Sequence, residues 1–154
     1  MFALRGITKH NISMKCDIYC DGGMHGKNPG KGYGMFMPII NGKRMSKTII
    51  PISGETTNNV AEFIGLLFGL KYLLDHKIHG ANVFMDSQLV VNCSTGKWKT
   101  KKAHLKPLCE KAEVMLMLTG AHLSWVSNVD NLCDPHVVGR MPLPDNDRER
   151  ILVA

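Results

Sequence analysis

Four carboxylates stand where the local sequence pattern changes, and together they point to metal-dependent chemistry. Asp21 follows an alternating strand pattern, and Asp86 follows a short apolar one. Glu62 lies near the start of a helical pattern, and Asp134 begins a later one. Because gathered carboxylates repel one another, a site that collects them needs divalent cations to be tolerated. Hard oxygen ligands of this kind suit Mg²⁺, with Mn²⁺ as a substitute.

Each carboxylate also has a purely structural interpretation. Asp21 precedes two glycines and fits a turn, whereas Glu62 fits a capping box that starts at Asn59. Asp86 and Asp134 fit helix N-caps. Taken one at a time, the four residues favour these structural interpretations. Only the motifs around them, taken together, favour chemistry.

A group of strands joined by a hairpin opens the chain. Residues 15–21 alternate between apolar and polar side chains, which predicts a strand ending at Asp21. Residues 33–40 and 43–52 have strand-like composition, and the Asn41-Gly42 pair between them predicts a tight turn. We therefore expect three antiparallel strands before the first helix.

The remaining elements alternate between helices and strands. Phe63, Leu67, Leu70 and Leu74 form one apolar stripe of a helix that starts near residue 58, with Gly80 beyond its end. Later elements are a strand over residues 82–86, helices starting at Ser87 and Pro107, a strand over 122–126 and a short helix from Asp134. This order predicts an α/β fold with a mixed five-stranded sheet, its first three strands antiparallel, flanked by helices.

The composition excludes several classes of protein. With 154 residues, 44% hydrophobic and 21% charged, the chain is globular rather than disordered. The longest apolar run, residues 114–118, is far too short to span a membrane, so no membrane partner is expected. Nineteen Lys and Arg against thirteen Asp and Glu give a net charge of +6. That balance favours a polyanionic partner such as nucleic acid.

The cysteines and the ends of the chain suggest its location and organisation. Five cysteines without a C-x-x-C pair indicate free thiols in a reducing cytoplasm. We expect one domain over residues 15–140, an N-terminal extension over 1–14 and a mobile charged tail over 141–154. Met14 is an alternative start of the natural protein. A monomer is the expected state.

The motifs around the four carboxylates resemble those of type 1 ribonuclease H. The resemblance lies, in the same order, in residues 18–23 with 26–34, residues 57–62, residues 84–88 and residues 125–134. It implies a ribonuclease H-like fold over residues 15–140. It also implies hydrolysis of the RNA strand of an RNA–DNA hybrid, leaving 5′-phosphate and 3′-hydroxyl ends.

The resemblance assigns a role to each carboxylate. Asp21 is expected to bridge two Mg²⁺ ions, and Asp134 to help hold the ion that activates water. Glu62 and Asp86 are expected to hold the ion near the leaving oxygen. Two cations about 4 Å apart suffice for such an in-line displacement.

The resemblance also identifies residues that bind the substrate. An RNA strand carries 2′-hydroxyl groups that amides can recognise in the minor groove. The amides expected to do so are those of Asn28, Asn58, Asn59 and Gln88. Thr57, with Asn59, resembles a pocket for a DNA-strand phosphate, and Trp98 resembles the tryptophan that contacts DNA sugars. The structural alternatives are turn and cap hydrogen bonds for the amides and a solvated loop for the basic run around Trp98.

Two departures from the family pattern stand out. Residues 97–106 connect two helices directly, where many bacterial members carry a longer basic protrusion, so the chain resembles the handle-less subgroup. The loop before Asp134 offers Ser127, Asn128 and Val129 where many members have a histidine. His25, in the glycine-rich loop, is a hypothetical substitute.

Two other functions stay open: a non-catalytic module that binds RNA–DNA hybrids, and a DNA-acting nuclease of the same fold. All four carboxylates are present, which argues against the first, and the amides favour RNA over DNA as the cleaved strand. A nucleotide-binding glycine loop is excluded, because residues 30–34 lead into a strand and no G-K-[ST] follows.

Overall fold

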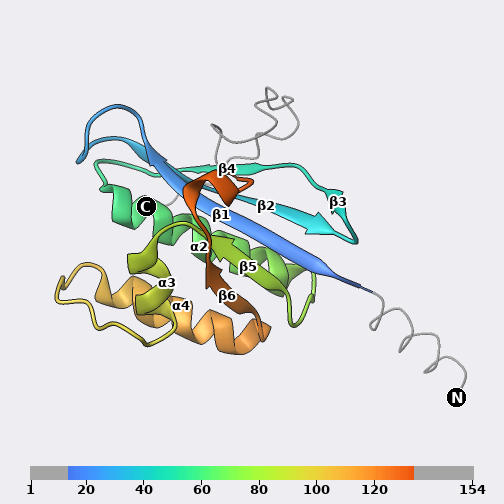
Figure 1. The fold of residues 1–154 in the computed structure, drawn as a ribbon. Coiled ribbons are helices and arrows are strands. Elements are labelled where there is room, and N and C mark those ends of the chain that lie inside the picture. Colours follow the sequence, from blue (N-terminus) through green and yellow to red (C-terminus); the bar gives the residue numbers. More distant parts are fainter. Residues whose placement is uncertain (1–13, 134–154) are drawn as a thin grey trace, which may run out of the picture.

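A mixed sheet with a long central strand organises the molecule. The computed structural model describes residues 14–133. Strand β1 (Cys16–Met24) lies between β2 (Gly32–Ile40), which runs antiparallel to it, and β5 (Asn82–Met85), which runs parallel. Strand β6 (His122–Trp125) continues the parallel half beside β5 (Figure 1). The predicted mixed sheet with an antiparallel front is confirmed.

The alternation predicted that the first strand ends at Asp21, but β1 continues to Met24. It does so because β2 keeps pairing with it, from Asp21↔Met35 to Met24↔Gly32. The parallel pairing with β5 stops earlier, at Tyr19↔Phe84. Asp21 therefore lies within β1 but beyond the end of its pairing with β5, where one edge of the strand is open.

The predicted strand over residues 43–52 is two strands, β3 (Lys43–Arg44) and β4 (Thr48–Pro51), so the sheet has six strands instead of five. Both strands pair with β2. Between the pairs Ile39↔Arg44 and Phe36↔Thr48, the segment that carries β3 and β4 is one residue longer than the facing segment of β2. Met45 N–H donates to Pro38 O at 2.8 Å, and Pro38 has no N–H to return a bond on that side. The ladder is interrupted there, and residues 45–47 form a bulge.

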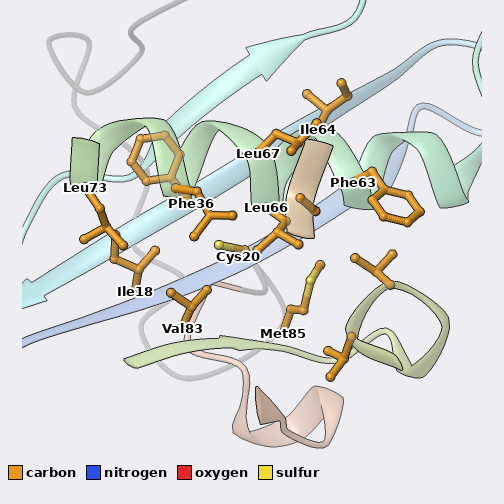
Figure 2. Close-up of a cluster of buried hydrophobic side chains, with 14 of the residues drawn as sticks. Ile18, Cys20, Phe36, Phe63, Ile64, Leu66, Leu67, Leu73, Val83 and Met85 are labelled. Carbon is orange, nitrogen blue, oxygen red and sulfur yellow. The ribbon is translucent and has the colours of Figure 1, made fainter. Parts of the chain in front are cut away.

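Three helices cover one face of the sheet: α2 (Asn58–Asp75), α3 (Gln88–Ser94) and α4 (Lys106–Thr119). Helix α2 packs directly on β1 and β2, and α3 and α4 pack against α2. The interface between α2 and the sheet is the main core, drawn in Figure 2. Its buried side chains include Ile18, Cys20, Phe36, Phe63, Leu66, Leu73, Val83 and Met85.

The ends of the helices mostly follow the predicted signals. Ser87 caps α3 by accepting from Val90 N–H at 3.2 Å, and Gly120 ends α4 in the left-handed region. Helix α2 differs at both ends. Thr57, not Asn59, is its N-cap, so the predicted capping box is wrong. Its last turn closes at Asp75, and Lys77, with φ 55°, takes the left-handed position predicted for Gly80.

The cysteines also follow the prediction. All five cysteines are free and buried, as expected. Among residues 14–133, no helix is both long enough and apolar enough to cross a membrane.

Candidate metal centre

Asp21 is the buried member of the carboxylate group, with 7% of its surface exposed. Its Oδ1 accepts the Gly22 N–H at 2.8 Å. Because β1 extends past β5 at this point, the side chain lies at the open edge between the two strands. Asp21 is thus held by the strand itself instead of a flexible turn.

Glu62 reaches Asp21 because α2 lies unusually close to the sheet. A Cβ at Gly22 would collide with the main chain of Ala61 and Glu62, and one at Gly65 would collide with Asp21 O. A Cβ at Gly34 would come within 2.5 Å of Gly65 N. The three glycines remove the side chains that would otherwise separate helix from strand. Glu62, the fifth residue of α2, is thereby placed beside β1.

The surroundings of Glu62 do not favour its charge. Burial is the main cause that raises the pKa of Glu62 above its ordinary value, and the negative charge of Asp86 adds to the increase. Hydrogen bonds with Ser87 and with Asn58 Nδ2, 3.1 Å from Glu62 Oε1, lower the pKa but do not offset the burial. A cation at this place would reverse that balance, because it stabilises the ionised carboxylate.

Asp86 follows the last residue of β5 and is held by its neighbours in the sheet. Trp125 Nε1–H donates to Asp86 O at 3.1 Å, and Val126 N–H donates to Met85 O at 3.0 Å. Ser87, the next residue, caps α3. The Asp86 main chain is therefore fixed by β6 on one side and by the start of α3 on the other.

The three carboxylates come together as one cluster. Asp21, Glu62 and Asp86 each offer an oxygen, and these oxygens all lie within 4.8 Å of one another. A buried carboxylate, a second one with a raised pKa and a third at the same edge form a donor set of hard oxygens that fits a divalent cation. The fourth predicted carboxylate, Asp134, lies outside the described residues.

Three of the predicted substrate-binding residues gather at the start of α2. Asn28 Oδ1 accepts from Asn58 N–H at 3.2 Å, which ties the glycine-rich loop to the helix. Asn58 also holds Glu62, and Thr57 accepts from Val60 N–H at 3.4 Å. The cap and turn bonds expected as the structural alternative are thus present, on residues that border the carboxylate cluster.

The other predicted binding residues lie on separate elements. Asn59 is the second residue of α2, half-buried, and Gln88 is the exposed first residue of α3, two residues after Asp86. Trp98, 47% exposed, lies on the connection between α3 and α4. There it borders a groove of about 660 Å³ whose lining includes Lys99, Lys101 and Lys106.

Sequence reasoning missed the residues that position the cluster. Trp125 lies within one of the sequence motifs, but nothing local shows that its indole reaches Asp86. The glycines at positions 34 and 65 gave no signal of a close helix–strand approach. Ser87 was recognised as a cap, but its bond with Glu62 depends on the packing of α2 beside α3.

One family model and several curated proteins match most of the chain. A family model described as reverse transcriptase-like matches residues 19–133. The bifunctional protein Rv2228c of Mycobacterium tuberculosis is 35% identical over 120 residues, which are 77% of this chain and 33% of that protein. The chain therefore spans about a third of the length of the curated relatives it matches.

Solved structures share the fold. The N-terminal RNase H domain of Rv2228c has a TM-score of 0.70 and 31% identity, covering 80% of this chain and 95% of that one. RNase H1 of the halophilic archaeon Halobacterium salinarum has a TM-score of 0.70 and 27% identity, covering 76% and 89%. LC11-RNase H1, isolated from compost and solved with an RNA/DNA hybrid, has a TM-score of 0.64 and 31% identity, covering 77% and 89%. The chain shares its fold with these RNase H proteins and carries a carboxylate cluster on it. It therefore belongs to the type 1 ribonuclease H family.

Proposed function

We propose that this protein hydrolyses the RNA strand of RNA–DNA hybrids with the help of divalent cations. The observation that carries the proposal is the cluster of Asp21, Glu62 and Asp86, with oxygens within 4.8 Å of one another, in a chain of this family. A related enzyme, LC11-RNase H1, was solved with an RNA/DNA hybrid. The net charge of +6 suits a polyanionic substrate.

Two Mg²⁺ ions, or Mn²⁺ as a substitute, would be held by four carboxylates: those of Asp21, Glu62, Asp86 and Asp134. Bound there, the ions would lower the pKa of a water and stabilise the departing 3′-oxygen, giving 5′-phosphate and 3′-hydroxyl products. Asp21 supplies a rigid, buried ligand because β1 holds it. Asn58 and Ser87 orient Glu62, and Trp125 holds the main chain of Asp86.

Strand choice falls to the amides beside the cluster. A 2′-hydroxyl both donates and accepts, and an amide side chain can satisfy both functions. We assign this recognition to the amides of Asn28, Asn58, Asn59 and Gln88. Thr57, with Asn59, is assigned to a phosphate of the DNA strand. Trp98, with its neighbouring lysines, is assigned to the sugars and the backbone of the same strand.

The proposal extends to the organisation of the chain. Residues 15–140 are assigned to the catalytic domain, and the handle-less connection between α3 and α4 to its basic substrate contact. Helix α3 ends at Ser94 and α4 begins at Lys106, which supports a short connection in place of a protrusion. The enzyme is proposed to act as a monomer, which sedimentation can check.

Cleavage of a hybrid labelled on either strand tests the function. With Mg²⁺ we expect loss of the RNA strand only, and no loss with EDTA. Asp21→Asn should abolish cleavage, because it removes the central ligand while keeping the shape of the side chain. Asp75→Asn is the matched control, since Asp75 forms an exposed pair with Lys71 at the far end of α2 and should stay active.

The remaining outcomes separate the alternatives. Binding of the hybrid without cleavage would favour a non-catalytic binding module. Loss of the DNA strand would favour a DNA-acting nuclease of the same fold. Full activity of Asp21→Asn would contradict the assignment of the metal centre.

A further inference from the structure

The glycine-rich loop between β1 and β2, residues 25–31, is bound to the segment that leads into α2 (Figure 1). His25 N–H donates to Lys31 O at 2.8 Å and closes the base of the loop. Gly30 and Thr56 form an antiparallel bridge, in which Gly30 N–H donates to Thr56 O at 2.9 Å and Thr56 N–H donates to Gly30 O at 2.7 Å. Both bridge residues are buried, so water does not compete for these bonds.

A second contact continues the bridge in the same antiparallel register. Asn28 lies two residues before Gly30, and Asn58 lies two residues after Thr56. At this pair a side chain replaces the main chain as acceptor, because Asn58 N–H donates to Asn28 Oδ1 at 3.2 Å. Asn58 is the first residue of α2, so its N–H has no partner within the helix. Asn28 therefore supplies a bond that the helix itself cannot make.

This bond fixes which way the Asn28 amide faces. A carboxamide has an acceptor end and a donor end. If Nδ2 faced the Asn58 N–H, two donors would oppose each other and the bond would be lost. Oδ1 therefore faces the helix and Nδ2 faces away from it. Towards a ligand, Asn28 presents a hydrogen-bond donor.

Close packing transmits the position of the bridge to Asn28. A Cβ at Gly30 would lie 2.7 Å from Lys27 O and 3.1 Å from Lys27 Cγ, so the residue before Asn28 rests directly on Gly30. A Cβ at Gly32 would lie 2.9 Å from Thr56 Cγ2, so the other side of the bridge is packed as well. The main chain on both sides of the bridge has little room to shift.

We propose that the Gly30–Thr56 bridge and the Asn58 N–H position Asn28, so that Asn28 recognises a 2′-hydroxyl of the RNA strand as a donor only. The inference rests on the proposed function, because it takes the RNA strand as the ligand of Asn28. Since Oδ1 is bound to Asn58, Nδ2 donates to the 2′-oxygen, which deoxyribose lacks. Because the amide is already oriented, binding does not have to order it.

Binding of modified hybrids in EDTA, where no cleavage is expected, tests the inference. A single 2′-deoxynucleotide is moved one position at a time along the RNA strand. At the position that Asn28 recognises, the unmodified protein should bind the modified hybrid about tenfold more weakly, the effect of one lost hydrogen bond. Asn28→Asp keeps an oxygen for the Asn58 N–H but has no donor, so at this position it should bind both hybrids equally. The ratio of the two affinities cancels the general effect of the added charge.

A matched pair of variants at Asn58 tests the orientation of the amide. Asn58→Pro removes the N–H, and proline is well tolerated at the first position of a helix. Thr57, with φ −118° and ψ 162°, already has the conformation required before proline. Asn58→Ala loses the same side chain but keeps the N–H. We expect Asn58→Ala to retain the tenfold ratio at the position of Asn28, and Asn58→Pro to lose most of it.

Gly30→Ala tests the bridge, because the added Cβ would displace the main chain of Lys27. It should reduce the ratio at the position of Asn28 without changing the ratios elsewhere. Lys31→Met, which alters an exposed side chain of the same loop and keeps the bond to His25, should leave every ratio unchanged. Circular dichroism checks folding, and the Asn58 pair decides the matter if Gly30→Ala does not fold.

The inference is wrong if Asn28→Asp still distinguishes the two hybrids at every position, or if Asn58→Pro distinguishes them as well as Asn58→Ala does. Cleavage of the hybrid by the unmodified protein with Mg²⁺ reports separately on the function. A ratio that depends on Asn28, without any cleavage, would overturn the proposed function and leave the role of Asn28 intact. Cleavage with no dependence on Asn28 at any position would do the reverse.

Discussion

Replacing Gly65 by alanine would test the close approach of α2 that brings Glu62 to Asp21. A Cβ on Gly65 would collide with Asp21 O and lie 3.0 Å from Met35 O. Both oxygens belong to the main chain of paired strands, β1 and β2. They cannot give way unless the whole helix moves off the sheet. The substitution therefore acts on the same packing that assembles the metal centre.

The size of the effect follows from two opposing contributions to the free energy of unfolding. Alanine is favoured over glycine inside a helix by about 1 kcal/mol. Overpacking a tight interior costs about 1–3 kcal/mol, and contact with main-chain atoms puts Gly65→Ala at the upper end. We expect a net loss of about 2 kcal/mol. For a chain of this size the melting temperature should fall by roughly 4–8 °C.

Gly69→Ala is the matched control on the same helix. A Cβ there would meet Cys20 Sγ at 2.8 Å and Ile18 Cγ2 at 3.4 Å, which are side-chain atoms able to shift. Its loss of stability should stay below about 1 kcal/mol, because the gain in helix propensity offsets a milder clash. Thermal and urea denaturation measure both variants. Mn²⁺ titration should show weaker binding only for Gly65→Ala.

Two results would refute the reasoning. If Gly65→Ala is as stable as the unmodified protein, the helix is free to adjust and the glycine contacts do not position Glu62. If Gly69→Ala loses as much stability as Gly65→Ala, the distinction between main-chain and side-chain obstacles is wrong.

Three further predictions concern the metal centre and the end of α2. Burial raises the folded-state pKa of Glu62, so the metal-free protein should gain stability as the pH falls from above that pKa towards the ordinary glutamate pKa of about 4.3. Glu62→Gln should remove this pH dependence, raise the melting temperature in EDTA at neutral pH and weaken Mn²⁺ binding. Trp125→Phe loses the indole bond to Asp86 O and should weaken Mn²⁺ binding severalfold in a titration, whereas Trp98→Phe, which alters the other tryptophan, should not. Lys77→Gly relieves a left-handed residue at the end of α2 and should stabilise the fold by about 1 kcal/mol, seen as a rise in melting temperature; no rise would mean that this turn is not strained.

Local patterns in the sequence predicted the order of the elements and most of their limits. Alternation, helical periodicity and caps such as Ser87 reflect interactions within a few residues, so they can be recognised without a fold. The carboxylates at positions 21, 62 and 86 were identified in the same way, from the motifs around them. Their meeting in one cluster was expected from the family resemblance, and the structure brings these three together.

Other features depend on partners that lie far away in the sequence. β1 continues past Asp21 because β2 pairs with it, and the predicted third strand breaks because Pro38 on the neighbouring strand offers no N–H. The capping box at Glu62 is wrong because Thr57 caps the helix, and the Glu62 carboxylate bonds to Ser87, 25 residues away at the start of the next helix.

The sequence by itself therefore determined which carboxylates are candidates for the metal centre and on which kinds of element they lie. Only the tertiary structure decided how closely α2 approaches β1, which indole holds Asp86 and how the loop that carries Asn28 is bound to α2. The physical reason is range. Propensity and capping act between near neighbours, whereas the spacing of metal ligands is set by contacts between segments that meet only after the core has packed.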